Sequence, residues 1–330
     1  MAFSQSMAVV GRFSLFKVVH MFSIVFQALY SRFKYDVHTL YYMPGGSNSV
    51  PVMRDIFILS FLRLFFKKTI FHFRAAGVSE VVARQPYLFK KMAQLVYHAP
   101  DLAIHLSALN PNDGGYFKAK KVVVIPNGLE DAALPYLPIL RKNKEFVTIL
   151  YVGLVQETKG LVVLLEAAKI LHDKGNKIRV NIVGDYGTPT FKEQALTFCK
   201  ENNLEKVVIF RGEKKGHEKW QYYIDADVFC FPSFYESESF GNVLVEAMMF
   251  ELPVVGTRWR GIPDLIDENK TGFIVPIKDP KDTANKLEAF IVDTNLRQEY
   301  GRNARKKFLS TFQVECFFHN LQKHFVNIHK

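Results

Sequence analysis

Short runs of apolar, β-branched residues alternate with longer segments of helical periodicity along most of the chain. The runs have the length and composition of buried strands. The predicted strands are Val37–Tyr42, Thr69–Phe73, Leu95–His98, Val122–Ile125, Val147–Val152, Ile178–Val183, Val207–Phe210, Asp227–Phe231, Pro253–Gly256 and Gly272–Val275. The predicted helices between them include Leu161–Asp173, Thr190–Glu201, Asn242–Phe250 and Lys281–Val292. This alternation predicts an α/β fold with parallel sheets covered on both faces.

The chain of 330 residues is long enough for two α/β domains. Its character changes between Leu134 and Lys144, where two prolines and a charged run are typical of a linker. We therefore predict a first Rossmann-like domain over residues 1–140 and a second over 141–310. An aromatic helix is predicted over 311–330.

The first domain opens unusually for a doubly wound sheet, which normally begins with a buried strand and a glycine-rich turn. Here the chain opens in a helix-like pattern. The first recognisable strand, Val37–Tyr42, is followed by the loop PGGSNS at Pro44–Ser49. Either the opening strand is missing from this chain or the domain is reduced.

Two apolar segments of the first domain bear on contact with a membrane. Met7–Phe33 is interrupted by Arg12, Lys17 and His20, so no uncharged run approaches the roughly 20 residues of a membrane span. It also lacks the cleavage site of a signal peptide, and we interpret it as an amphipathic helix packed on the first domain. The second segment, Asp55–Lys68, ends in basic residues. It could lie on a membrane surface or form a buried helix.

The charge of the chain, +11 in total, is concentrated in its first half. Residues 1–145 hold 18 Lys and Arg against 8 Asp and Glu, whereas residues 146–330 hold 25 against 24. A basic half of this kind indicates an anionic partner, such as an anionic lipid, a phosphate-bearing acceptor or nucleic acid, or else a solvated basic face. Because no helix-turn-helix or RNA-recognition signature is present, we expect no nucleic-acid partner.

The cysteines indicate neither a disulfide framework nor a zinc site. Cys199, Cys230 and Cys316 are widely spaced and form no CxxC pair, which fits a reducing compartment. No DxD motif stands between apolar strands, so we expect no metal and no other cofactor. A dinucleotide-binding dehydrogenase is excluded because no GxGxxG motif follows a strand.

The most informative stretch is Phe231–Met248, FPSFYESESFGNVLVEAM. A buried strand ends at its first residue and a polar loop follows, which carries Glu238. A helix then opens near Gly241, and Glu246 lies on it, eight residues after the first glutamate. The stretch therefore places two carboxylates around a helix N-terminus that follows a buried strand.

That layout suits a sugar nucleotide. A helix N-terminus offers free N–H groups and a positive dipole to a diphosphate, and Gly241 lets a ligand approach the backbone closely. Asn242 and Val243 share the helix face of Glu246 because they lie four and three residues before it. One glutamate could hold ribose hydroxyls while the other holds the sugar. The structural alternative is a helix cap and a surface charge.

This stretch resembles the E-x7-E signature of GT-B glycosyltransferases, especially those of glycosyltransferase family 4. Further segments resemble other parts of that family, in the right order, over about residues 120–280. They are Val122–Glu130, Ile149–Ala168, Asn181–Tyr186, Ala226–Ser233, Glu251–Ile266 and Thr271–Pro276. The resemblance implies a GT-B fold, in which two Rossmann-like, doubly wound parallel-sheet domains face a cleft. It also implies that the C-terminal helix packs back toward the first domain.

The resemblance further implies how a nucleotide-diphosphate sugar would be bound. Glu246 would hold the donor ribose, and Glu238 would contact the hydroxyls of the donor sugar. Phe240, Gly241 and Asn242 would present backbone N–H groups to the sugar and the phosphates.

The phosphate loop carries the one departure from the family pattern. Gly153 would open this loop, and Lys159 would neutralise the diphosphate as it leaves. The family often has Arg directly after the glycine, whereas this chain has Leu154, so one phosphate cation is missing. The candidates to replace it are Arg258, Arg260 and Arg74.

The family also commonly places a histidine at the cleft, against the donor sugar, where His72 ends a predicted strand. Taken alone, such a histidine is more often a structural residue. Arg74, two residues on, would point the same way from a continuing strand. Asn127 and Gly128 are expected to shape a turn rather than to take part in chemistry.

The function implied is retaining transfer of a sugar from a nucleotide-diphosphate donor to a glycan or lipid-linked acceptor. The nucleotide diphosphate would leave through an oxocarbenium-like transition state, stabilised by Lys159 and the helix N-terminus, without a metal or a side-chain base. Charge and family habit predict surface polysaccharide or lipopolysaccharide assembly in the cytoplasm, with peripheral contact to the anionic inner face of the cell membrane. The alternatives are an inactive or donor-binding-only remnant, a nucleotide-sugar epimerase and a phosphorylase.

Overall fold

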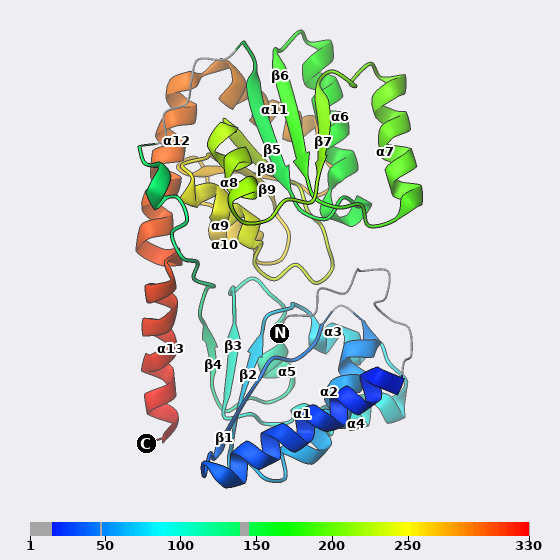
Figure 1. Ribbon diagram of the computed structural model, residues 1–330, viewed down its shortest axis with the longest axis vertical. Coiled ribbons are helices and arrows are strands. Elements are labelled where there is room, and N and C mark those ends of the chain that lie inside the picture. The colour runs from blue at the N-terminus through cyan, green and yellow to red at the C-terminus, as the bar shows by residue number, and fades with distance from the viewer. Residues whose placement is uncertain (1–14, 47, 139–144, 330) are drawn as a thin grey trace. The chain divides into compact units, whose positions relative to one another are not determined.

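A computed structural model of the protein describes residues 15–46, 48–138 and 145–329 (Figure 1). The chain divides into two compact units. The first runs to Ile125 and also takes in the chain from His324 onward, and the second runs from Pro126 to Lys323. Each unit contains one parallel sheet, which confirms the predicted α/β class.

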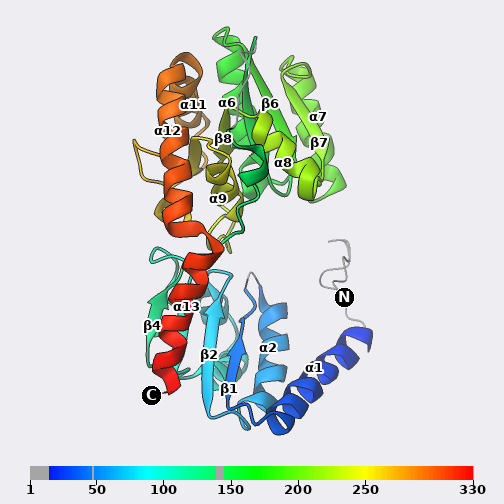
Figure 2. The same cartoon turned by 60° about the vertical axis from the view of Figure 1, so that its left-hand side comes forward.

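The first unit is built around a four-stranded sheet of order β1-β2-β3-β4, in which every neighbouring pair is parallel (Figure 2). Its elements are α1 (Leu15–Lys34), β1 (Thr39–Tyr42), α2 (Ser49–Leu62), β2 (Lys68–Phe73), α3 (Val78–Ala83), α4 (Tyr87–Tyr97), β3 (Leu102–His105), α5 (Asp113–Tyr116) and β4 (Val122–Val124). The helix α13 (Val314–His329) begins in the second unit, and its last residues belong to the first.

The first sheet grows in one direction only, with each strand added beside the one before it. Because crossovers between parallel strands are right-handed, crossovers in one direction place their helices on the same face. The core on that face joins residues of the strands, such as Leu40, Phe71 and Ala103, to residues of the helices, such as Ile58 and Val82. Among the described residues, β1 and β4 are the two edges of this sheet.

The prediction of a strand at Leu95–His98 is wrong. These residues end α4, which turns Ala93, Val96 and Tyr97 toward the core at helical spacing. The third strand is Leu102–His105, a four-residue run that is buried throughout. Periodicity alone cannot distinguish a short apolar run in a strand from one in a buried helix.

Both apolar segments of the first unit form helices that pack on its core. In α1, Val25 is buried, and Ile24, Ala28 and Leu29 pack beside it; the predicted residues before Leu15 lie outside the described part of the chain. One face of α2 is buried, made of Val52, Asp55, Ile58, Leu59 and Leu62. The segment is therefore a packed helix up to Leu62. Within the described ranges, no helix has the length and hydropathy to cross a membrane.

A buried carboxylate ties α2 to β1 and α4. Asp55 is fully buried and accepts hydrogen bonds from the hydroxyls of Tyr42 and Tyr97, each at 2.7 Å. It also accepts from the N–H of Gly45 at 2.6 Å and from the guanidinium of Arg54 at 2.7 Å. Burial, and then the charge of Asp55, raise the pKa of both tyrosines, so both remain hydrogen-bond donors. The charge is therefore well satisfied, as a buried carboxylate must be.

The second unit contains a six-stranded parallel sheet of order β10-β9-β8-β5-β6-β7. Its strands are β5 (Val147–Val152), β6 (Ile178–Val183), β7 (Val208–Gly212), β8 (Val228–Phe231), β9 (Val254–Thr257) and β10 (Gly272–Val275). Its helices are α6 (Leu161–Asp173), α7 (Pro189–Glu201), α8 (Gly216–Asp225), α9 (Asn242–Met249), α10 (Ile262–Leu265), α11 (Pro280–Val292) and α12 (Thr294–Lys307), with short helical turns at η2 (Leu134–Tyr136), η3 (Glu157–Lys159) and η4 (Phe308–Phe312). This sheet is doubly wound, because strands are added on both sides of β5.

The division between the units falls earlier in the chain than predicted, while residue 140 itself lies outside the described ranges. The segment from Pro126 goes with the second unit because its contacts lie there. Leu129 pairs with Gln313 as an isolated bridge. The carboxylate of Asp131 forms a buried ion pair with the guanidinium of Arg305 on α12, at 2.5 Å.

We expect Asp55→Ala to destabilise the first unit by about 3 kcal/mol, because Tyr42, Tyr97 and Gly45 would keep buried donors without an acceptor. Thermal unfolding followed by circular dichroism would show a lower transition temperature. Glu193→Ala is the control, because this carboxylate is exposed on α7 and its removal should leave the transition unchanged. Unfolding of Asp55→Ala at the wild-type temperature would contradict this account.

Candidate functional site

Two loops meet where the second sheet reverses its strand order. β6 and β7 lie on one side of β5, and β8, β9 and β10 lie on the other. Ligands of open α/β sheets bind beyond the carboxyl ends of the strands at such a reversal. The segment Gly153–Gly160 follows β5, and Pro232–Gly241 follows β8. Both segments therefore leave the sheet at the position where a ligand is expected.

The backbones of the two loops are held against each other. The N–H of Phe234 donates to the carbonyl of Thr158 at 2.9 Å. Gly160 ends η3 with a φ of +78°, and a Cβ on it would lie 1.9 Å from the carbonyl oxygen of Pro232. Gly160 is therefore required both by its backbone conformation and by the lack of space.

The site contains an ion pair between these loops. The Nζ of Lys159 lies 2.7 Å from the Oε2 of Glu238, and the two side chains are 17% and 11% exposed. The hydroxyl of Ser233 donates to the same carboxylate oxygen at 3.1 Å. The ammonium also lies over the ring of Tyr235, 4.3 Å from its centre. Both charges are thus partnered and largely shielded from water, which strengthens their interaction.

Side chains beneath and beside the pair hold the loops in place. Tyr151 of β5 is fully buried, and its hydroxyl donates to the carbonyl of Leu154 at 2.8 Å. Burial, and then the charge of Glu238, raise the pKa of Tyr151 well above its usual range. The indole N–H of Trp259 donates to the carbonyl of Tyr235 at 2.8 Å. The acidic loop is therefore fastened to the segment that follows β9.

Gly153 begins the loop after β5 with a φ of +155°. Its N–H donates to the carbonyl of Val183, at the end of β6, at 3.0 Å. The backbone of Gly184 approaches it so closely that a Cβ on Gly184 would lie 1.8 Å from the carbonyl oxygen of Gly153. This close approach joins the loops after β5 and β6 at the same edge of the sheet.

The helix α9 begins beside the acidic loop. Its N-cap is Gly241, with a φ of +82° and no side chain to cap the first turn. Phe240 is buried, with its ring edge-on to Phe312 at 5.8 Å between centres. Asn242 is exposed at the start of the helix, where its side-chain oxygen accepts a hydrogen bond from the amide of Asn127 at 3.0 Å. The first-turn N–H groups and the helix dipole create positive potential at this end.

The second glutamate of the signature faces α8. The carboxylate of Glu246 accepts hydrogen bonds from the ammonium of Lys219 at 2.8 Å and from the hydroxyl of Tyr223 at 2.7 Å. The side chain of Glu246 is 13% exposed, and Val243, one turn earlier, is partly exposed. Burial, and then the charge of Glu246, raise the pKa of Tyr223 well above its usual range. The carboxylate is therefore oriented by two donors from one helix.

The alternative of a helix cap and a surface charge is not observed for either glutamate. The residue at the N-cap of α9 is Gly241. Glu238 and Glu246 are mostly buried, and each is paired with a lysine. The two carboxylates thus occupy prepared, charged environments of the second unit.

The predicted residues of the first unit lie on or beside β2. His72 is fully buried, and its Nδ1 lies 2.5 Å from the hydroxyl of Tyr41. Burial, and then the charge of Arg74, lower the pKa of His72 to about 4, so its imidazole is neutral at neutral pH. Arg74 follows the strand and is exposed.

Of the candidate replacement cations in the second unit, Arg258 pairs with Glu268 at 3.7 Å and is exposed. Arg260 stacks on the ring of Trp259 at 5.3 Å. Leu154 leaves its position in the loop after β5 without a charge. Lys159 is therefore the cation that the loop after β5 itself supplies.

Sequence reasoning missed three residues that orient the site. Lys219 and Tyr223 hold Glu246, and the amide of Asn127 contacts Asn242 rather than only shaping a turn. The first two are four residues apart on α8, so they share one helix face. That spacing was the available signal, but nothing in the sequence shows which helix the face meets.

Among the residues that the structure describes, no group of three or more His, Cys, Asp or Glu side chains is placed to hold a metal ion.

We expect Gly160→Ala to destabilise the second unit by about 2 kcal/mol more than Gly175→Ala does. The two glycines have nearly the same φ, +78° and +81°, but a Cβ at Gly175 meets nothing within 4 Å. The difference between the variants therefore isolates the collision with Pro232. The free energy of unfolding of each variant would be measured by urea unfolding. Equal losses for both substitutions would show that the two loops can move apart without destabilising the unit.

Sequence comparison identifies relatives of the chain. A profile of the family "Glycosyl transferases group 1" matches residues 136–307. The putative colanic acid biosynthesis glycosyltransferase WcaL of Escherichia coli (strain K12) is 35% identical over 299 residues, which cover 82% of this chain and 70% of that protein. The capsular polysaccharide biosynthesis glycosyltransferase CapM of Staphylococcus aureus is 32% identical over 180 residues, 54% of this chain and 46% of the length of CapM.

Solved structures resemble the fold of the chain. A sucrose-phosphate synthase from Thermosynechococcus elongatus matches 97% of this chain and 81% of its own, with a TM-score of 0.73 and 20% identity. HepE of Anabaena, solved in complex with UDP, matches 93% of this chain and 82% of its own, with a TM-score of 0.71 and 17% identity. These similarities confirm the predicted GT-B fold. The profile match and the similarity to WcaL show that the chain belongs to the glycosyl transferases group 1 family.

Proposed function

We propose that the protein transfers a sugar, with retention of anomeric configuration, from a nucleotide-diphosphate donor to a glycan or lipid-linked acceptor. The observation that carries this proposal is the Lys159–Glu238 pair, 2.7 Å long, at the strand reversal of the second sheet. The start of α9 follows the same loop, so a cation, a carboxylate and a helix N-terminus occur together. A sugar diphosphate needs these three groups, for its phosphates and its hydroxyls.

In this proposal, the donor diphosphate lies against the N-terminus of α9. The backbone N–H groups of Phe240, Gly241 and Asn242 bind the phosphates and the sugar, with Val243 beside them on the first turn. Gly153 allows the diphosphate to approach the loop after β5. The lack of a Cβ at Gly153 and at Gly241 keeps the backbone accessible at these two points.

Donor binding changes the partner of Lys159. A diphosphate carries more charge than a carboxylate, so it competes with Glu238 for the ammonium. The released carboxylate then accepts hydrogen bonds from hydroxyls of the donor sugar. The ion pair thus keeps both groups positioned until the donor arrives.

Glu246 binds the ribose of the donor. Its carboxylate is oriented by Lys219 and Tyr223, which leaves remaining acceptor positions for paired ribose hydroxyls. Because the raised pKa of Tyr223 keeps its hydroxyl protonated, this tyrosine remains a donor to the carboxylate.

In the reaction, the bond between the anomeric carbon and the diphosphate oxygen breaks, and the diphosphate leaves with the electron pair. The oxygen of the acceptor hydroxyl forms its bond on the same face of the sugar, and its proton passes to the departing phosphate. Lys159 and the α9 N-terminus stabilise the charge that grows on the leaving group. No side chain of the protein needs to act as a base. The contact of His72 with the donor sugar stays a prediction.

The relatives support the choice of donor and process. HepE was solved with UDP and with UDP-glucose, so a uridine diphosphate sugar is the first donor to test. WcaL and CapM are named for colanic acid and capsular polysaccharide biosynthesis. We therefore propose a step in surface polysaccharide assembly, carried out in the cytoplasm on an acceptor at the inner face of the cell membrane.

A second candidate function is donor binding without transfer. Leu154 favours it, because the loop after β5 lacks a second phosphate cation at that position. Slow hydrolysis or transfer of a bound donor would exclude this candidate, whereas binding without any turnover would support it.

We expect Glu246→Ala to weaken donor binding about 100-fold, because two hydrogen bonds to a charged acceptor are lost. Binding of UDP-, GDP- and ADP-sugars would be measured by calorimetry on the wild type, and the preferred donor on the variant. Glu193→Ala on α7 is the matched control, because this glutamate is exposed. A Glu246→Ala protein that binds the donor as the wild type does would remove this residue from the site.

Transfer is expected to continue after chelation of divalent metals, because Lys159 and the α9 N-terminus would supply the positive charge at the leaving group. Release of the nucleoside diphosphate would be assayed with and without EDTA. Activity that disappears on chelation and returns with Mg²⁺ or Mn²⁺ would disprove the metal-independent mechanism.

A further inference from the structure

The helix α1 exposes a continuous apolar stripe, which we call the outer face of α1. It consists of Val19, Phe22, Phe26, Tyr30 and Phe33, each between 52% and 71% exposed. Their spacings of three, four, four and three residues place them along one side of the helix. Four of the five are aromatic, so the face presents large apolar side chains to the surroundings.

The outer face of α1 is separate from the side of the helix that holds the domain together. Val25 is buried in the core of the first unit, with Ile24, Ala28 and Leu29 packed beside it. The helix is thus apolar on two sides, and among the described residues it is the inner side that packs on the core. A surface helix with no role beyond the fold normally has a polar outer side. The exposed apolar outer face of α1 therefore needs a different explanation.

The apolar surface continues from α1 onto α2 and the segment that follows α2. The ring of Phe22 meets Phe57 edge-on, with centres 5.0 Å apart, and Phe33 meets Phe65 at 6.0 Å. Phe65 and its neighbour Leu64 are exposed as well. Contiguous exposed apolar surface of this kind marks a site of interaction with a protein or a membrane.

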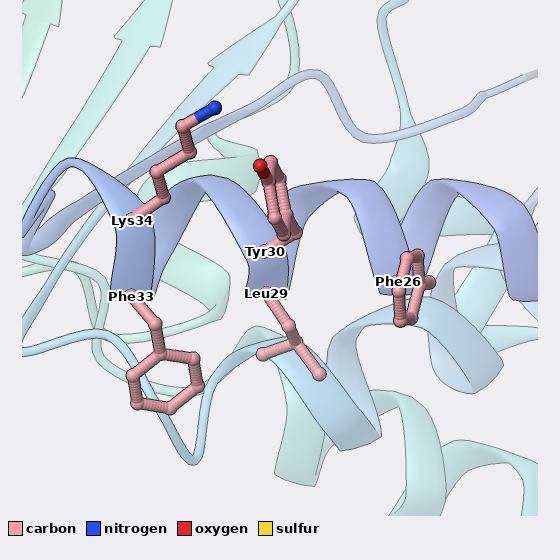
Figure 3. Close-up of a pocket in the computed structure, with 5 residues that line it drawn as sticks. All are labelled: Phe26, Leu29, Tyr30, Phe33 and Lys34. Carbon is pink, nitrogen blue, oxygen red and sulfur yellow. The ribbon is translucent and has the colours of Figure 1, made fainter.

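A shallow pocket of about 550 Å³ lies on this surface, and the residues that line it all come from α1. They are Phe26, Leu29, Tyr30, Phe33 and Lys34. Figure 3 shows these side chains on the part of α1 turned to the viewer, with Tyr30 and Lys34 toward its upper edge and Leu29 and Phe33 toward its lower edge. Because a single helix forms it, the pocket is an open hollow in an outer surface rather than an enclosed site.

Basic side chains border the apolar surface. The ammonium of Lys34 lies over the ring of Tyr30, 5.0 Å from its centre, and over that of Tyr35, at 5.3 Å. Lys67 is exposed just beyond Phe65. An aromatic body with a lysine whose stem runs along it is the arrangement found at a bilayer interface, where rings lie among acyl chains and ammonium groups reach the headgroups.

The charge of the whole unit favours an anionic partner. Residues 15–125 contain 14 Lys and Arg against 5 Asp and Glu. Two of the acids, Asp55 and Asp113, are buried, and Asp101 is paired with Lys120 at 2.8 Å. Few carboxylates are therefore left to repel an anionic surface.

We propose that the outer face of α1, with Lys34 and the adjoining Leu64–Lys67 segment, docks on an anionic lipid bilayer. The helix would lie in the plane of the membrane, with its aromatic stripe among the outer acyl groups and Lys34 at the phosphates of the headgroups. This names the surface for the membrane contact in the proposed function, but it depends on no residue of the donor site. Failure of one proposal therefore leaves the other standing.

The test is flotation of the full chain with vesicles of phosphatidylglycerol and phosphatidylcholine in equal parts, and with vesicles of phosphatidylcholine alone. We expect binding to the anionic vesicles, weaker binding as salt is added, and little binding to the neutral ones. Phe26→Glu should lower binding at least about tenfold, because it replaces an inserted ring with a charge. Phe26 is 71% exposed, so the variant should keep its fold.

Val292→Glu is the matched control, because Val292 is an apolar residue of α11 that is 70% exposed in the second unit. It should bind vesicles as the wild type does. A Tyr30→Trp variant adds a local readout, since the two natural tryptophans, Trp220 and Trp259, both lie in the second unit. Its emission should shift to shorter wavelength with anionic vesicles.

Three results would overturn the proposal. The first is no flotation with anionic vesicles, and the second is unchanged flotation of Phe26→Glu. The third is a dimer in sedimentation that Phe26→Glu dissociates, in a protein that does not bind vesicles. That result would assign the outer face to a second copy of the chain.

Discussion

The Lys159–Glu238 ion pair is the interaction on which the arrangement of the site depends. Its two members come from loops that leave β5 and β8, the adjacent strands at which the strand order of the sheet reverses. Removing two charges from water is costly, and attraction alone offsets the cost only when the geometry is good and further hydrogen bonds are made. Ser233 supplies such a bond to the carboxylate. The pair therefore forms only if both loops are held in register, and the backbone contact at Gly160 provides that restraint.

The second glutamate is also held by partners from a distant part of the chain. Glu246 lies on a helix whose N-terminus provides the free amides, while Lys219 and Tyr223 orient its carboxylate from α8. Each acidic group is thus held by a cation before any donor is bound. In the proposed function, only the partner of Lys159 changes when the donor binds, so the charged groups are already positioned for electrostatic stabilisation of the leaving group.

The first unit combines a buried polar network with an uncovered apolar helix face. Asp55 shows how the unit treats a charge it must bury, by surrounding it with donors. The outer face of α1 shows the reverse case, apolar side chains left outside the core although burial would stabilise them. In the proposed function, these two features belong to different tasks, one to the integrity of the domain and one to its attachment to a membrane.

The sequence by itself determined most of the strands and the residues of the acidic loop, because strand–helix alternation and the E-x7-E spacing are local patterns. The double winding of the second sheet was implied only by the resemblance to GT-B enzymes. The sequence could not distinguish Leu95–His98, which ends a helix, from Leu102–His105, which forms a strand, since a four-residue apolar run is compatible with both. Nor could it show that Lys159 meets Glu238 across 79 residues of chain, or that α8 supplies the partners of Glu246. Only the tertiary structure decided those contacts, because the order in which strands join a sheet brings distant loops together and no local pattern records that order.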